Sequence, residues 1–174
     1  MKLVFVNRFF YPDVSATSQM LSDAAFYLAG KGHEIHVVTS RLSYEGDARL
    51  DAREEVNGVQ IHRLWTTSFG RGKMIGRAID YVSFYFSVFF FLLQILESGD
   101  QVVAKTDPPL VSIPVGAAAR IRGARHVNWL QDIFPEVAVE LGMQIPGFVV
   151  SILTWLRNRS LLQADQNIVI GELM

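Results

Sequence analysis

The chain has 174 residues, the length of one domain, and its 16 basic residues are balanced by 17 acidic ones. This balance argues against a nucleic-acid-binding protein, which usually has a basic surplus. The absence of cysteine excludes disulfides and thiolate metal sites. The apolar run after Lys2 is only about five residues long, too short for a signal peptide. We therefore expect a cytoplasmic protein.

Strand-like and helical patterns alternate along the chain. The predicted strands are continuous apolar runs, at residues 3–7, 34–40, 101–106, 125–130 and 165–171. The predicted helices lie between them, at about 17–30, 74–98, 108–123 and 146–163. Continuous apolar strands separated by helices are typical of a parallel sheet that helices cover on both faces. The sequence therefore predicts one α/β domain spanning residues 1–174.

Two local signals refine this α/β prediction. Asn57-Gly58 between two extended runs is the strongest short signal for a β-hairpin, so we expect an added hairpin there. Pro114 lies inside the helix predicted to follow Pro108-Pro109, and proline inside a helix removes a hydrogen bond. A kink at Pro114 is therefore expected.

Four segments carry a resemblance to a known family, and they occur in the family's order along essentially the whole chain. The segments are FFYPDVSATSQMLSDAAFYLAGKGHEIHVVTSR, EEVNGVQIHRLW, KTDPPLVSIPVGAAARIRGARHVNWLQDIFPE and ADQNIVIGELM. Together they resemble the N-terminal domain of glycosyltransferase family 4, the retaining enzymes of GT-B fold. The similarity is greatest to the bacterial branch that assembles exopolysaccharide and O-antigen units.

The resemblance implies a Rossmann-like acceptor-binding domain. It also implies a second, C-terminal domain that binds a nucleotide-diphosphate sugar as donor substrate. That second domain is absent from this chain, so the 174 residues are expected to be inactive alone. The acceptor would be a lipid-linked saccharide, and the protein would lie peripherally at the inner face of the cell membrane. No cofactor, metal or nucleic acid is expected.

The first loop has small residues where relatives often carry glycines. Ser15, Ala16 and Thr17 open a predicted helix, whose backbone amides attract phosphate groups. The resemblance implies that these residues line the donor cleft. A serine or threonine there is equally suited to capping the helix. Both interpretations remain open.

Polar side chains also follow two of the predicted strands. Asp132 ends the strand at 125–130 and is the candidate catalytic residue, while Gln131 beside it is a candidate for binding a sugar hydroxyl. Asp107 has the same kind of position after the strand at 101–106. In a parallel sheet, ligands bind outside the carboxyl ends of the strands. The alternative for both aspartates is a helix cap. Asp107 directly precedes the helix predicted from Pro108, and Asp132 lies three residues before Pro135, where a further helix is expected to begin.

An uncharged run of aromatic and aliphatic residues, 81–96, lies in the long predicted helix. It is shorter than the roughly 20 residues that span a bilayer. A helix that is apolar nearly all round is either buried or in contact with lipid. The candidate residues for membrane contact combine cations with aromatic side chains: Arg71, Lys73, Arg77, Phe84, Phe90 and Trp155. Burial in the core is the competing interpretation.

Two other functions fit the same sequence. One is a GT-B sugar-nucleotide 2-epimerase, of which this chain would be a fragment. The other is a membrane-associated binding module without catalysis. Transfer to an added acceptor separates the first alternative from a glycosyltransferase.

Overall fold

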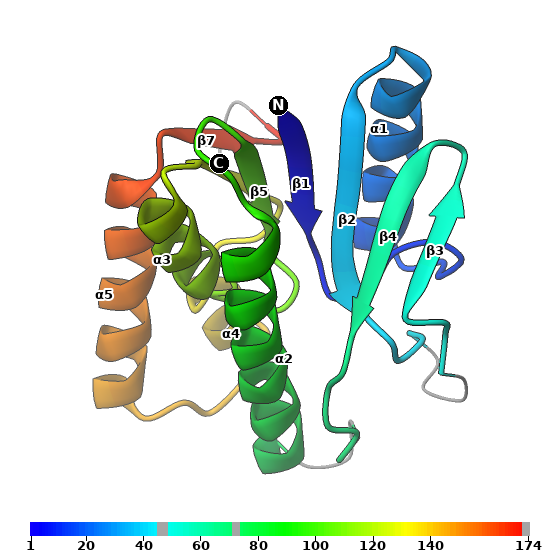
Figure 1. The fold of residues 1–174 in the computed structure, drawn as a ribbon. Helices are drawn as coiled ribbons and strands as arrows, with labels where there is room; N and C mark the ends of the chain where they lie inside the picture. Colours follow the sequence, from blue (N-terminus) through cyan, green and yellow to red (C-terminus); the bar gives the residue numbers. More distant parts are fainter. Residues whose placement is uncertain (45–48, 71–73, 172–174) are drawn as a thin grey trace.

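The computed structural model describes residues 1–44, 49–70 and 74–171, which form a mixed sheet flanked by helices on both faces (Figure 1). The strands are β1 (Lys2–Val6), β2 (Glu34–Ser40), β3 (Arg53–Val56), β4 (Val59–Leu64), β5 (Gln101–Lys105), β6 (Arg125–Leu130) and β7 (Gln166–Val169). The helices are α1 (Ala16–Gly30), α2 (Met74–Ile95), α3 (Ser112–Arg122), α4 (Glu136–Glu140) and α5 (Gly147–Gln163). The predicted α/β architecture is confirmed.

The strand order in the seven-stranded sheet is β3-β4-β2-β1-β5-β6-β7. All neighbouring strands are parallel except β3 and β4. Two hydrophobic clusters occupy its two faces. One contains α1 side chains, and the other contains side chains of α2 and α3. α5 packs beside α3 on that second face.

The expected hairpin at Asn57-Gly58 is confirmed as the antiparallel pair β3 and β4. Both turn residues have positive φ, 51° for Asn57 and 79° for Gly58. Asparagine and glycine are the residues that tolerate this conformation best, which explains why the sequence signal was reliable.

The expected kink at Pro114 has no basis in the folded chain, because α3 begins at Ser112 rather than near Pro108. Pro114 therefore lies in the first turn. Backbone N–H groups in a first turn have no partner inside the helix, so a proline there removes no helical hydrogen bond.

α2 is long and only partly covered by the rest of the chain. Among the described residues it is a helix with enough length and apolar character to cross a membrane, with a mean hydropathy of 1.6 over Ile75–Ile95. Only 22% of an 18-residue stretch within that segment is buried. This segment contains Arg77 and Asp80, so the run without charges is still the one at 81–96 seen in the sequence. Length and composition alone are weak evidence for a membrane span, since core helices share them.

One face of α2 packs on the sheet and the opposite face is exposed. Phe84 is fully buried in the core, so the expectation that it contacts a membrane is wrong. It lies on the inner face because its spacing to Val88 and Leu92 matches the helical repeat. The exposed apolar side chains recur at similar intervals on the outer face, and we call them the α2 stripe: Ile75, Ile79, Val82, Phe86 and Phe90.

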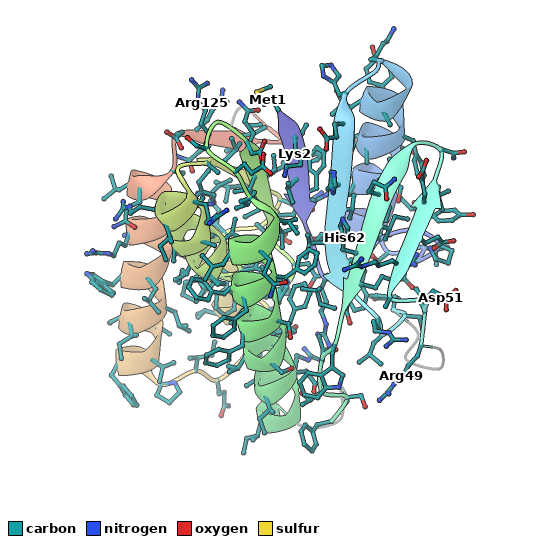
Figure 2. All side chains as sticks on the ribbon, in the orientation of Figure 1. Met1, Lys2, Arg49, Asp51, His62 and Arg125 are labelled. Carbon is teal, nitrogen blue, oxygen red and sulfur yellow. The ribbon has the colours of Figure 1, made fainter. Side chains whose placement is uncertain are left out.

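Two histidines lie between the sheet and its helices, one partly buried and one fully buried. His62 of β4 lies between the sheet and α2, where its ring centroid is 5.1 Å from that of Phe91 (Figure 2). Its Nε2 is 3.0 Å from Nδ1 of His36 on the adjacent strand. His126 of β6 is buried below α3. A side chain at Gly116 would meet this imidazole, because an added Cβ would lie 2.8 Å from the His126 Nδ1.

Gly116→Ala is expected to lower the free energy of unfolding by about 1 kcal/mol. Overpacking a buried ring costs about 1–3 kcal/mol, whereas the helix preference for alanine regains about 1 kcal/mol. Urea denaturation measures this difference. Gly147→Ala is the matched control, since an added Cβ there meets nothing within 4 Å. Equal stability of the two variants would show that the His126 ring moves freely.

Candidate functional site

The order of the strands reverses between β1 and β5. The chain leaves β1 for β2 on one side, and it reaches β5 on the other side through α2. Loops at such a reversal diverge and leave a crevice at the carboxyl ends of the strands, where ligands of α/β folds bind. A hydrogen bond joins the two loops, in which the backbone N–H of Arg8 donates to the Asp107 carbonyl at 2.7 Å.

The first loop ends in a capped helix. The Ser15 hydroxyl accepts a hydrogen bond from the Ser18 backbone N–H at 3.3 Å, so Ser15 is the N-cap of α1. The capping role considered for this residue is therefore confirmed. Ala16 is exposed and Thr17 is half-buried in the first turn. The first turn of α1 lies at the carboxyl ends of the strands. Its backbone N–H groups are therefore also placed to bind a ligand.

Lys105 ties this first turn to the sheet. It ends β5 and is almost fully buried, and its Nζ donates to the Thr17 carbonyl at 2.9 Å. The same ammonium lies 4.2 Å from the centroid of the Trp129 ring. Burial lowers the pKa of Lys105 to about 8, while the charge of Asp107 acts in the opposite direction. A buried cation with a strongly shifted pKa beside a cleft is characteristic of functional sites.

Gln131 and Asp132 point to different partners although they are adjacent. The Gln131 side-chain amide donates to the Met20 sulfur at 2.9 Å, so this residue contacts α1. Asp132 is exposed and lines a cavity below β5 and β6. The helix that follows, α4, begins at Glu136 with Pro135 as its N-cap and has no side-chain capping hydrogen bond. Asp132 is therefore not the cap of α4, which removes the simpler explanation for it.

The cavity beside Asp132 has a volume of about 110 Å³ and is lined by residues of β5, β6, α3, α4 and α5 and of the loops between them. Thr106 and Asn128 line it, and each carries a buried side-chain oxygen with no hydrogen-bond partner among the residues the structure describes. Native proteins rarely leave such oxygens unpaired, so each calls for an explanation.

A second cation lies in the loop after β1, at the same carboxyl end of the sheet. The Arg8 guanidinium lies 5.0 Å from the ring centroid of Tyr81 on α2 and 5.2 Å from that of Phe9. Burial and the Asp107 charge raise the pKa of Tyr81, although Arg8 opposes them. The carboxyl end of the sheet thus carries two cations, Arg8 and Lys105, together with the carboxylate of Asp132 and aromatic rings. Cations of this kind are suited to binding phosphate groups.

The structure places most of the predicted site residues at one edge of the sheet. Thr17, Gln131, Asp107 and Asp132 all lie at the carboxyl ends of the strands or at the start of α1. Of the predicted membrane contacts, Phe90, Trp155 and Arg77 are exposed. Arg71 and Lys73 lie outside the described residues.

Sequence reasoning missed four residues of the site, namely Arg8, Lys105, Thr106 and Asn128. A signal existed for two of them. Lys105 and Asn128 are polar residues inside apolar strand runs, which is unusual unless the side chain has a buried partner.

A search with models of protein families finds no match for the chain, and a search of curated proteins finds none either.

Proposed function

We propose that this chain is the acceptor-binding half of a retaining glycosyltransferase. The complete enzyme would move a sugar from a nucleotide-diphosphate sugar to a lipid-linked saccharide during surface polysaccharide assembly. The observation that supports this proposal most directly is Asp132, an exposed carboxylate at the carboxyl edge that caps no helix and borders a polar cavity. Such a carboxylate can orient a sugar hydroxyl or accept its proton.

The other groups at this edge have roles that fit the same proposal. Arg8 and Lys105 place positive charge beside the crevice, where the phosphates of donor and acceptor would lie. The first turn of α1 offers backbone N–H groups to an anion. In the proposal a second domain, specific for the nucleotide sugar, closes over this edge.

We also propose that the chain binds a membrane surface. Membrane binding fits both the glycosyltransferase and a non-catalytic membrane-binding module. The α2 stripe supports both interpretations, since the described part of the chain leaves this row of large apolar side chains largely exposed. A lipid-linked acceptor resides in the membrane, so an acceptor-binding domain benefits from lying on it. Sugar transfer by the complete protein distinguishes the glycosyltransferase from the non-catalytic module.

Asp132→Asn is expected to lower sugar transfer by about a hundredfold, a typical loss when a positioned proton acceptor is removed. Asparagine keeps the shape of the side chain and one oxygen, but it loses the charge. The measurement is transfer of labelled sugar from a nucleotide-diphosphate sugar to a lipid-linked acceptor by the complete protein. Asp23→Asn on the exposed side of α1 is the matched control and should keep the parent rate.

Two outcomes contradict the proposal. If Asp132→Asn keeps the parent rate, the carboxylate takes no part in transfer. If the complete protein converts the donor alone and ignores added acceptor, the chain belongs to an epimerase. Circular dichroism at the start of each assay shows that the variants are folded.

A further inference from the structure

Lys105 is a charged residue that is buried as completely as the hydrophobic core. It is 1% exposed, so a ligand cannot contact it directly. Its Nζ donates to the Thr17 carbonyl at 2.9 Å and lies 4.2 Å from the centroid of the Trp129 ring. Among the described residues, no carboxylate lies within ion-pair distance of this ammonium. A carbonyl and an aromatic ring thus take the place of a carboxylate partner.

The stability of the fold does not account for a charge at this position. Removing an ammonium from water without a carboxylate partner is costly. The start of a helix also carries a partial positive charge, which repels a cation beside it. The first turn of α1 contains no acidic residue that would offset either cost. A buried charge that opposes folding in this way is characteristic of a functional site.

The charge of Lys105 is sensitive to pH because the residue is buried. Burial lowers its pKa to about 8, and the charge of Asp107 acts in the opposite direction. Asp132 and Arg157 line the same cavity as Lys105, and Trp129 faces it from β6. Aspartate and arginine ordinarily keep their charge between about pH 7 and about pH 9.5, and tryptophan has none. Of these groups, Lys105 is therefore the one whose charge changes over that range.

The first turn of α1 has two N–H groups that an anion can use. Ser18 and Gln19 donate their backbone N–H groups to the hydroxyl and the carbonyl of Ser15. The N–H groups of Ala16 and Thr17 donate to no other described residue, as is usual for the first positions of a helix. Lys105 binds the carbonyl of the same turn, so its position affects these N–H groups.

We propose that Lys105 is a positioning residue for an anion at the first turn of α1. The charged ammonium would hold the Thr17 carbonyl and fix the turn against β5, and its charge would add to that of the helix end. The neutral amine would do neither as well. This inference rests on the proposed function, in which a phosphate group of a substrate lies at this turn, and it adds the residue that controls the affinity for that group.

The first measurement is an NMR titration of the 174-residue chain from about pH 7 to about pH 9.5. It follows the methyl signals of Ala16 and Thr17, because methyl protons do not exchange with water. In the parent we expect both signals to shift with a midpoint near the pKa of Lys105, which is about 8.

The second measurement is the affinity for sulfate, an anion whose own charge stays constant over this range. We expect the parent to bind sulfate about fivefold or more weakly at the upper pH, because contacts of a charged donor are stronger than those of a neutral one. The coupling is reciprocal, so saturating sulfate should raise the midpoint of the methyl titration by about one pH unit if the charge changes the affinity about tenfold.

Two variants and a control assign these effects to the ammonium. Lys105→Met keeps the length of the side chain without its charge, so it should bind sulfate weakly at both pH values and show no methyl titration. Lys105→Arg keeps a charge over the whole range and should bind equally at both. Lys31→Met removes a lysine at the other end of α1 and should behave as the parent does. Circular dichroism shows that each variant is folded.

Equal affinity of the parent for sulfate at both pH values would overturn the role of Lys105 without the need for any variant. The same conclusion would follow if Lys105→Met bound as tightly as the parent, if Lys105→Arg lost affinity at high pH, or if no form of the chain bound sulfate. None of these measurements uses sugar transfer. The positioning role and the transfer activity tested with Asp132→Asn therefore fail separately.

Discussion

Replacing both Phe86 and Phe90 by serine is expected to weaken binding of the chain to anionic vesicles about thirty- to hundredfold. The two rings are 61% and 57% exposed on the α2 stripe. Burying a phenylalanine side chain contributes about 1.5–3 kcal/mol, and the part of each ring that is already covered reduces this gain. Together the pair contributes about 2–3 kcal/mol, and each 1.4 kcal/mol corresponds to a factor of ten.

The measurement is flotation with vesicles that contain anionic lipid, at low salt and at 1 M salt. Salt shortens the Debye length to about 3 Å at 1 M, so it removes the charge contribution and spares the apolar one. A variant with Arg71, Lys73 and Arg77 neutralised should therefore resemble the parent at high salt. Each cation near the surface contributes about 1 kcal/mol at low salt.

Tyr27→Ser is the matched control for the loss of an exposed aromatic ring. Tyr27 is 65% exposed and lies on α1, on the opposite face of the sheet. This variant should float with the vesicles as the parent does. If the parent stays in the soluble fraction at both salt concentrations, α2 does not contact a membrane and another partner covers its stripe.

Lowering the pH from 7.5 to 5 is expected to reduce the free energy of unfolding by about 3 kcal/mol. Burial lowers the pKa of His126 from 6.5 to about 4, opposed by the Asp165 charge. Burial, followed by the charges of His36 and Arg53, lowers the pKa of His62 to about 4 as well. The folded chain therefore keeps both imidazoles neutral at a pH where the unfolded chain protonates them.

The direction follows from the protons bound in each state. Between pH 6.5 and pH 4 the unfolded chain binds more protons, so stability falls as the pH falls. At pH 5 a shift of this size costs about 2 kcal/mol for the buried His126. His62 is partly exposed, and solvent screening reduces its share to about 1 kcal/mol. The contribution of Asp100, whose pKa is lowered from 3.8, is lost only at still lower pH.

Urea unfolding of His126→Leu at the two pH values tests this assignment. The variant has no imidazole to protonate at this position, so its stability should fall by only about 1 kcal/mol over the same range. Tyr27→Ser is the control, because this substitution leaves both histidines in place. It should keep the full dependence of stability on pH. If His126→Leu retains it too, protonation of His126 does not control acid stability.

The sequence by itself determined the order and type of nearly every element. Strands such as β2 and β6 were predicted with their observed bounds, because continuous apolar runs ending in polar residues have few other interpretations. The hairpin was equally clear, since Asn57-Gly58 satisfies a turn that requires positive φ at both positions. The start of α3 was wrong by a few residues, as helix boundaries often are in proline-rich segments.

Only the tertiary structure decided which polar residues meet. Lys105 and Thr17 are 88 positions apart in the chain, and no local pattern joins them. The buried oxygens of Thr106 and Asn128 become notable only once the surrounding helices enclose them. The sequence placed Asp132 at a strand end, but whether it caps α4 depended on where that helix begins. Phe84 and Phe86 are both aromatic residues of α2, and the rotation of the helix against the sheet buries one and exposes the other. Local sequence determines backbone conformation through short-range sterics and periodicity, whereas a site requires contacts that form only when distant segments pack.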